Sequence, residues 1–293
     1  MRIAVVTTSY PSYDGDPSGH FVQAEVRGLE RAGHEVAVVR PVAGGAFGWP
    51  GVATRLREQP LRAMEAGLWA VRANREVAQL RADRVVSHWC IPCAFPIARD
   101  AAELEIVSHG GDVRLLCGLP EALRARVVAS LLDRAVLWRF VSEELRSALA
   151  AVLTPHDRTR LAGISTVAPS ALDVPDVRAE VSEARRAIGE RRLYVCAGRL
   201  VASKRVDKVI DYVATSRGER VLVVLGDGPQ RAQLERMARA WQVDIRFLGT
   251  TPRREALGWI GAADELVHAS KVEGLSTVVR EASALGVPVT FVG

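Results

Sequence analysis

The stretch Ala263–Val289 constrains the chain more than any other, because it combines a strand, a loop and a helix start. Its apolar run Glu265–Ala269 suits the edge of a buried strand. A helix is predicted over about Ser276–Leu285, since serine is a good N-cap residue. The helix should stop where Gly286 can take the left-handed position, with Pro288 just beyond it.

Two glutamates flank the predicted start of this helix. Glu273 lies in the loop beside Gly274, which suits a tight backbone approach, and Glu281 lies inside the helix. The first turn leaves backbone N–H groups without helical partners, which makes it a natural seat for phosphate. These groups belong to Leu275, Ser276 and Thr277. The two carboxylates can then reach hydroxyls on either side of a diphosphate, the geometry of a nucleotide-sugar site. The alternative is a surface helix with two solvated carboxylates.

Length, composition and charge narrow the class of protein. The chain has 293 residues, enough for about two domains with a full core in each. Its apolar fraction of 48% and charged fraction of 25% are those of a soluble globular protein. The net charge of +5 suits anionic ligands such as diphosphates, or an acidic membrane surface. Because the basic residues are not clustered with aromatic ones, we expect no nucleic-acid partner.

Targeting signals and disulfides are not expected. The N-terminus MRIAVVTTSYPS has a short apolar core without a cleavage pattern, so it predicts a first strand rather than a signal peptide. No apolar run approaches the roughly 20 residues needed to cross a bilayer. The four cysteines are too few and too scattered for a secreted disulfide framework. We therefore expect a cytoplasmic protein, and its charge leaves peripheral association with the inner face of the membrane open.

Both halves of the chain alternate strands with helices. Arg2–Thr7 is continuously apolar, as a strand buried on both faces should be. After the next helix, Val36–Val39 supplies a second strand, which predicts a right-handed crossover in a parallel sheet. The same alternation of strands and helices begins again at the predicted strand Leu193–Ala197. We therefore predict an α/β chain of two Rossmann-like domains, 1–175 and 176–293.

Two turns at predicted strand ends carry candidate chemistry. After Arg84–Ser87 comes His88-Trp89-Cys90-Ile91-Pro92-Cys93, and Trp-Cys-x-Pro-Cys between a strand and a helix is typical of a thioredoxin-like redox site. Zinc is disfavoured there, because a second ligand pair is missing. His109-Gly110-Gly111-Asp112 follows the predicted strand Ile106–Ser108. The two glycines predict a tight backbone turn packed against a neighbouring group. The alternative is a turn histidine with Asp112 as a cap.

The loop after Leu193–Ala197 carries the cations Arg199 and Lys204. Transfer of a sugar from a nucleoside diphosphate leaves negative charge on the leaving group, which a metal or fixed cations must meet. Arginine offers a planar fork and lysine a movable point charge, and a diphosphate can use both. Lys204 is one of only three lysines in a chain rich in arginine, so composition does not explain it. Two solvated loop cations are the alternative.

Taken in order, four motifs resemble the retaining glycosyltransferases of the GT-B fold, glycosyltransferase family 4 or glycosyl transferases group 1. They are Gly19, His109–Asp112, Gly198-Arg199 with Lys204, and Glu273 with Glu281. The resemblance extends over nearly the whole chain, and because it includes the His88-Trp89 turn, it favours the glycosyltransferase interpretation over the redox one. It implies two Rossmann-like domains facing across a cleft, with the acceptor on the first and the donor on the second.

The resemblance also implies an activity and a set of residues. The activity is metal-independent, retaining transfer of the hexosyltransferase type from a UDP- or GDP-sugar, with no cofactor. Arg199 and Lys204 neutralise the diphosphate, and Glu281 binds the ribose hydroxyls. The catalytic residues His109 and Glu273 face the donor sugar, and the leaving phosphate helps to accept the acceptor's proton. The full donor-binding set is Gly19, Arg199, Lys204, Gly274, Leu275, Ser276 and Glu281.

The chain departs from the family in two places. Ala269-Ser270 stands where the family usually has Pro-Ser, and Lys271 adds a cation to the loop. The chain stops at Gly293, where the family continues with a strand and helices, so an incomplete second domain is expected. The alternatives are a nucleotide-sugar-binding protein without turnover, completed by a partner chain, and a sugar-nucleotide epimerase, for which no additional general base is found. The donor's base and sugar, and the acceptor, stay undetermined.

Overall fold

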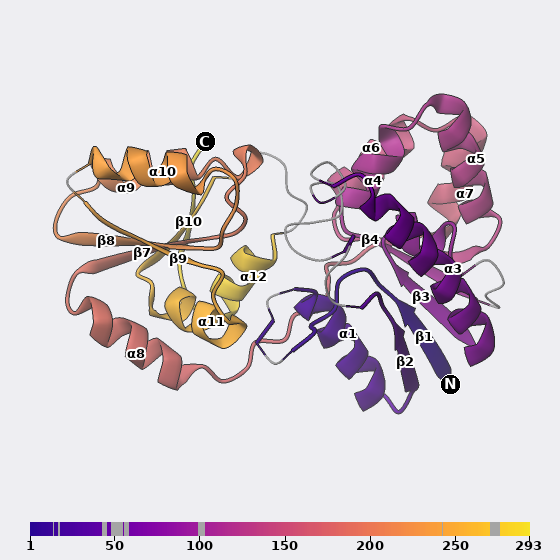
Figure 1. Cartoon of the computed structure of the whole chain (residues 1–293), viewed down its shortest axis with the longest axis horizontal. Helices are drawn as coiled ribbons and strands as arrows, with labels where there is room; N and C mark the ends of the chain where they lie inside the picture. The colour runs from indigo at the N-terminus through magenta and orange to yellow at the C-terminus, as the bar shows by residue number, and fades with distance from the viewer. Residues whose placement is uncertain are drawn as a thin grey trace. The chain divides into compact units, whose positions relative to one another are not determined.

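The chain forms two compact units, each of the α/β class (Figure 1). The first unit comprises Met1–Ser12 and Ser18–Ala171, and the second comprises Tyr13–Pro17 and Leu172–Gly293. The structure is a computed structural model that describes residues 1–13, 15–16, 18–42, 46–47, 55, 59–98, 103–241, 243–269 and 276–293.

The first unit is built on a parallel sheet with strand order β2-β1-β3-β4-β5-β6. Its strands are β1 (Arg2–Val6), β2 (Glu35–Val39), β3 (Arg84–His88), β4 (Leu104–Ser108), β5 (Ala135–Phe140) and β6 (Ser165–Val167). The order reverses between β1 and β3. In open α/β sheets, ligands bind beyond the carboxyl ends of the strands at such a reversal.

Helices cover both faces of this sheet, which explains why its strands are continuously apolar. Helix α1 (His20–Arg31) packs Val22 and Val26 against one face, and the other described helices of the unit pack on the opposite face. Those helices are α3 (Arg62–Leu80), α4 (Gly111–Cys117), α5 (Glu121–Leu132), α6 (Glu143–Ala151) and α7 (Pro155–Ile164). Ser142 stands at the N-cap of α6, but its hydroxyl makes no cap hydrogen bond.

The second unit has a parallel sheet with strand order β11-β10-β7-β8-β9. Its strands are β7 (Arg192–Ala197), β8 (Arg220–Leu225), β9 (Asp244–Gly249), β10 (Glu265–His268) and β11 (Val289–Phe291). The order reverses between β7 and β10. The loops predicted to bind the donor follow these two strands, so both predicted donor motifs belong to the reversal point of one sheet.

Helices α9 (Val206–Thr215) and α10 (Arg231–Arg239) cover one face of the second sheet, and α8 (Arg178–Ile188), α11 (Arg253–Ala262) and α12 (Thr277–Ala284) cover the other (Figure 1). The apolar stripe of α9, formed by Val206, Val209, Ile210 and Val213, is fully buried. The predicted end of α12 is confirmed, since Gly286 has a φ of 75°. Although proline is common at the first helical position, Pro229 does not begin α10, which starts two residues later at Arg231.

Helix α8 lies just after the predicted domain boundary at 175/176, and the sequence analysis predicts no helix there. Val181, Ala184 and Ile188 pack its apolar side into the core of the second unit. It crosses α11 closely, because a side-chain carbon on Gly258 would lie 2.5 Å from Cβ of Glu180. The helix therefore belongs to the second unit and is not a linker.

Candidate functional site

Two glycines let the loops after β7 and β8 meet backbone to backbone. A side-chain carbon on Gly226 would collide with the carbonyl oxygen of Gly198, and one on Gly228 would lie 2.5 Å from that of Leu200. Hydrogen bonds join the same loops, since the Leu200 N–H donates to the Asp227 carbonyl oxygen at 2.9 Å. Both positions require glycine, and the loop that carries the predicted cations is thereby fixed at the reversal point.

Lys204 lies close to the carboxyl ends of β7 and β10. It ends a single helical turn, and its Cε lies 3.9 Å from where a Cβ on Gly198 would stand. Burial lowers the pKa of His268, at the end of β10, to about 4, and the charge of Lys204 adds to this effect. Burial raises the pKa of Cys196, in β7, to about 12, and the same charge opposes that rise. The Lys204 ammonium group therefore places a positive charge at this end of the sheet.

Glu281 is buried and forms an ion pair with Arg253, the first residue of α11. The Glu281 carboxylate accepts from Arg253 Nη1 at 2.5 Å, and the two side chains are 7% and 16% exposed. Arg253 also donates from Nη2 to the Asp173 carbonyl oxygen at 2.6 Å and from its backbone to Gly15 at 3.0 Å. Glu281 therefore holds three chain segments together through Arg253. Its predicted contact with the ribose stays a prediction.

Two further residues of the predicted donor set, Arg199 and Ser276, are described in the second unit. Arg199 is half-buried in the loop after β7. Ser276 stands at the N-cap of α12, as predicted, although its hydroxyl makes no cap hydrogen bond. Glu273, Gly274 and Leu275 lie outside the described residues.

In the first unit, Asp112 organises the turn that carries His109. Its carboxylate accepts from the backbone N–H groups of His109 and Gly110, at 3.1 and 3.0 Å, and from that of Cys90, at 2.9 Å. The structure shows the capping Asp112 of the alternative interpretation, and the same carboxylate also reaches the neighbouring turn after β3. A buried carboxylate with three such donors fixes both turns relative to each other.

His109 contacts a neighbour through each ring nitrogen. Its Nε2 lies 2.9 Å from Nδ1 of His88, and its Nδ1 lies 3.3 Å from the Ser170 hydroxyl. Burial lowers the pKa of both imidazoles to about 3. The charge of Arg139 lowers the pKa of His88 further. Both rings are therefore neutral near pH 7. The structure pairs His109 with His88; its contact with a donor sugar stays a prediction.

Gly19 is required by the packing of its own loop. It stands at the N-cap of α1 with a φ of 66°, and a side-chain carbon there would collide with the carbonyl oxygen of Ser9. Phe21, two residues later, places its ring 4.8 Å from that of His109 and 6.1 Å from that of Trp89. The approach of Gly19 to donor phosphates stays a prediction.

Cys90 and Cys93 lack the properties of a redox pair. Both are buried free thiols, and burial, with the nearby Asp112 carboxylate, raises the pKa of each well above its usual range. A reactive cysteine needs a low pKa and access to its partner. These thiols act as small packing groups in the core.

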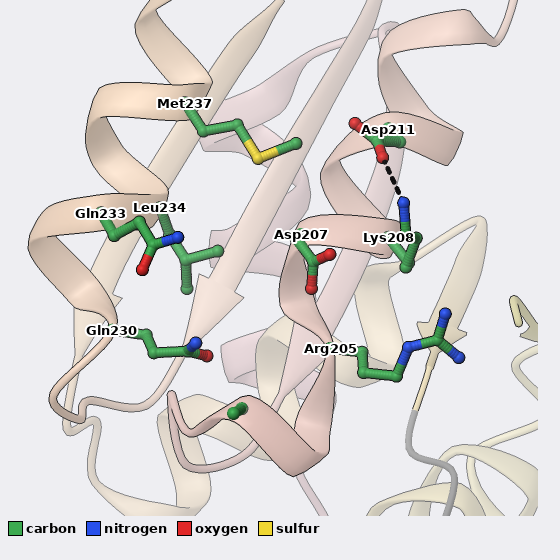
Figure 2. Close-up of a pocket in the computed structure, with 9 residues that line it drawn as sticks. Arg205, Asp207, Lys208, Asp211, Gln230, Gln233, Leu234 and Met237 are labelled. Atoms are coloured by element: carbon green, nitrogen blue, oxygen red, sulfur yellow. Dashed lines mark hydrogen bonds and ion pairs between the residues drawn. The ribbon is translucent and has the colours of Figure 1, made fainter.

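A cavity of about 460 Å³ lies between α9 and α10 in the second unit (Figure 2). Gln233 on α10 and Gln230 just before it present their amides to the cavity, and Lys208 on α9 pairs with Asp211 at 3.1 Å. Among the described residues, its lining consists of Ala202, Arg205, Asp207, Lys208, Asp211, Gln230, Gln233, Leu234 and Met237. None of the predicted donor-binding residues that the structure describes belongs to this lining.

Comparison with known proteins identifies the family. Residues 177–291 match the family described as Glycosyl transferases group 1. The chain is 30% identical to the GDP-mannose-dependent alpha-(1-6)-phosphatidylinositol monomannoside mannosyltransferase of Mycolicibacterium smegmatis, over 97% of this chain and 78% of that protein. The chain belongs to the glycosyl transferases group 1. As a member of glycosyltransferase family 4, it is a nucleotide-sugar-dependent glycosyltransferase of a retaining family, as the sequence predicts.

Solved structures show the fold of this glycosyltransferase. Sucrose-phosphate synthase from Thermosynechococcus elongatus matches with a TM-score of 0.70 at 18% identity. Anabaena HepE, in its complex with UDP-glucose, matches with a TM-score of 0.66 at 19% identity. Each match covers 99% of this chain and 80% of the other chain. At these identities the likeness establishes the fold alone, and that fold is GT-B.

Sequence reasoning missed three residues that contribute to these contacts, Arg253 in the second unit and His88 and Glu25 in the first. Glu25 pairs with Arg139 and lies 3.9 Å from Nε2 of His88. Arg253 follows Pro252 at the start of α11, and no pattern links it to Glu281. His88 carried a usable signal, because it ends β3 and His109 directly follows the neighbouring strand β4. Residues at the ends of adjacent parallel strands meet at one edge of the sheet. Glu25, on α1, carried no signal.

Proposed function

We propose that this glycosyltransferase transfers a hexose from a nucleoside-diphosphate sugar to an acceptor carried by a lipid, with no metal ion. The position of Lys204 carries the proposal. It is a fixed cation at the strand-order reversal of the second sheet, where ligands of open α/β sheets bind. A cation there can meet the charge that develops on the leaving diphosphate, which is the task of a metal in other sites.

A lipid-borne acceptor is supported by the relative from Mycolicibacterium smegmatis, a GDP-mannose-dependent phosphatidylinositol monomannoside mannosyltransferase. That name makes GDP-mannose the first donor to test, with UDP-glucose as the second because the HepE structure contains it. In this proposal the chain works at a membrane surface, on the side where nucleotide sugars are made.

Titration calorimetry tests the donor half of this proposal. GDP-mannose or UDP-glucose should bind with unchanged affinity when a chelator is present, because protein cations replace the metal. Transfer should then be followed with radiolabelled donor and a phosphatidylinositol mannoside. Loss of binding on chelation contradicts metal independence. Binding with slow donor hydrolysis but no transfer to any acceptor favours a nucleotide-sugar-binding protein without turnover.

A stripe of exposed apolar side chains along α3 supports work at a membrane. Leu61, just before the helix, and Met64, Leu68 and Val71 on it recur at the spacing of one helical face. Their exposed fractions run from 53% at Val71 to 82% at Leu61. The exposed Arg72 and Arg75 adjoin the stripe. An apolar stripe beside cations suits a surface with acyl chains and anionic headgroups. No helix among the described residues is long and apolar enough to cross a membrane.

Replacing both Met64 and Leu68 by serine should reduce binding to vesicles of phosphatidylcholine and phosphatidylinositol by about tenfold or more, because burial of such a side chain contributes about 1.5–3 kcal/mol. Vesicle sedimentation measures the change. Leu123→Ser, which removes an exposed leucine from α5, is the matched control and should bind as the parent does. Equal binding by all three proteins contradicts the assignment. A dimer of the parent that the double variant loses, seen by light scattering, would assign the stripe to a second copy of the chain.

A further inference from the structure

A row of largely buried polar side chains runs from His109, which follows β4, through His88 to Glu25 on α1. His88 Nδ1 lies 2.9 Å from His109 Nε2, and His88 Nε2 lies 3.9 Å from Oε2 of Glu25 on α1. The other oxygen of Glu25 accepts from Arg139 on β5, whose Nε lies 3.5 Å from Glu105. His88 is fully buried, and the Glu25 side chain is 14% exposed. Neither Nε2 of His88 nor Oε2 of Glu25 has a hydrogen-bond partner among the described residues.

The charge of Glu25 determines which nitrogen of His88 holds the proton. A lone pair on Nε2 would face a carboxylate oxygen at 3.9 Å and be repelled, whereas an N–H there is attracted. A neutral imidazole carries one proton, so Nδ1 of His88 is then the acceptor. The 2.9 Å contact with His109 consequently requires the N–H of His109 Nε2. The remaining nitrogen of His109, Nδ1, is left with a lone pair.

We infer that Glu25, acting through His88, holds His109 in the tautomer whose Nδ1 accepts a hydrogen bond, so that His109 recognises a hydroxyl group of the donor sugar as an acceptor. The Ser170 hydroxyl, 3.3 Å from Nδ1, occupies the position of such a hydroxyl. His88 and Glu25 are positioning residues, since neither needs to touch the substrate. The part of the inference that concerns the sugar rests on the proposed function, and the tautomer does not.

Glu25→Gln tests the tautomer in the free protein. The glutamine carbonyl should keep the contact with Arg139, which leaves its amide to donate to His88 Nε2. The proton of His88 then moves to Nδ1, and that of His109 moves from Nε2 to Nδ1. Long-range nitrogen–proton NMR spectra of the chain labelled at its six histidines distinguish the two forms of each ring. Signals of the pair are assigned with His88→Gln and His109→Gln.

Glu105→Gln is the matched control, because it removes the other carboxylate near Arg139 and leaves the one that faces His88. The expected result is a proton on His109 Nε2 in the parent and in Glu105→Gln, and on Nδ1 in Glu25→Gln. A proton on Nδ1 in the parent, or the same tautomer in all three proteins, overturns the inference.

Donor affinity tests the consequence for the sugar. Glu25→Gln should weaken a bound sugar nucleotide roughly three- to tenfold, the effect of losing one hydrogen bond, and leave the plain nucleoside diphosphate unchanged. Glu105→Gln should leave both unchanged. If the spectra show the expected tautomers but neither ligand binds any variant or the parent, the proposed function fails and the tautomer assignment stands. Equal weakening of both ligands in Glu25→Gln would contradict a role in recognising the sugar.

Discussion

Replacing Glu281 by alanine is expected to lower the free energy of unfolding by about 3–5 kcal/mol, because removal of one partner leaves the other as an uncompensated buried charge. Nη1 of Arg253 lies 2.5 Å from Oε1 of Glu281, and the side chains are 16% and 7% exposed, respectively. After the change, the Arg253 guanidinium group would keep, among the described residues, only the Asp173 carbonyl oxygen as an acceptor. Urea unfolding measures the loss, and hydrogen exchange of peptides from β10 and α12 locates it in the second unit.

Two further variants test whether the loss of stability arises from this ion pair rather than from any substitution in the region. Arg254→Ala removes the next arginine of α11, which is 53% exposed and pairs with Glu180, so it should cost less than about 1 kcal/mol. The double variant Arg253→Leu with Glu281→Leu should recover most of the lost stability, since an apolar pair can replace a buried ion pair without net cost. A loss below about 1 kcal/mol in Glu281→Ala would show that the ion pair does not hold the unit together.

The stability of this pair affects how the predicted ribose contact is tested. If Glu281→Ala weakens donor binding, part of the effect arises from the loss of Arg253, which anchors the Gly15 and Asp173 segments. Comparison of Glu281→Ala with Arg253→Ala separates the two contributions. A direct contact with the ribose requires that Glu281→Ala weakens the nucleoside diphosphate more than Arg253→Ala does.

The sheets could be predicted from the sequence because their strands are buried on both faces. The run Val221–Leu225 is continuously apolar, and the strand β8 that it forms is longer by one residue, Arg220. The stripe of α9 was equally clear, because its four valines and isoleucines recur at helical spacing and all are buried. Helix α8 was missed, because its apolar residues are separated by Arg178, Glu180, Glu183 and other charges that conceal the stripe.

The candidate site was predicted where its residues are close in sequence, and missed where contacts join distant segments. Lys204 and Ser276 could be found in local motifs. The pair Arg253 and Glu281 spans 28 positions, and Glu25 and Arg139 span 114, and no local pattern encodes either contact. The glycines after β7 and β8 can be read from the sequence. The need for glycine at these positions, however, arises from the close approach of the two loop backbones. Such an approach is a property of the assembled sheet.

Lys204→Ala should weaken a bound nucleoside diphosphate by about 1.5–3 kcal/mol, or roughly 10- to 150-fold, the contribution of a hydrogen bond to a charged group. Lys204 stands at the reversal of the second sheet, where its charge also reaches His268. Lys208→Ala is the matched control, because Lys208 lies one turn away on α9 and pairs with Asp211. Calorimetric titration with GDP and UDP, in the presence of a chelator, measures both variants.

The pKa of His268 gives a second, ligand-free measure of the same charge. It is about 4 in the parent, chiefly through burial and further through Lys204. Lys204→Ala removes the cationic contribution, so the pKa of His268 should rise while burial keeps it below the ordinary 6.5, and Lys208→Ala should leave it unchanged. A bound diphosphate in the parent should also raise it, because the anion offsets the lysine charge. If Lys204→Ala changes neither the diphosphate affinity nor the pKa of His268, Lys204 does not face the donor, and the proposed function loses the residue that carries it.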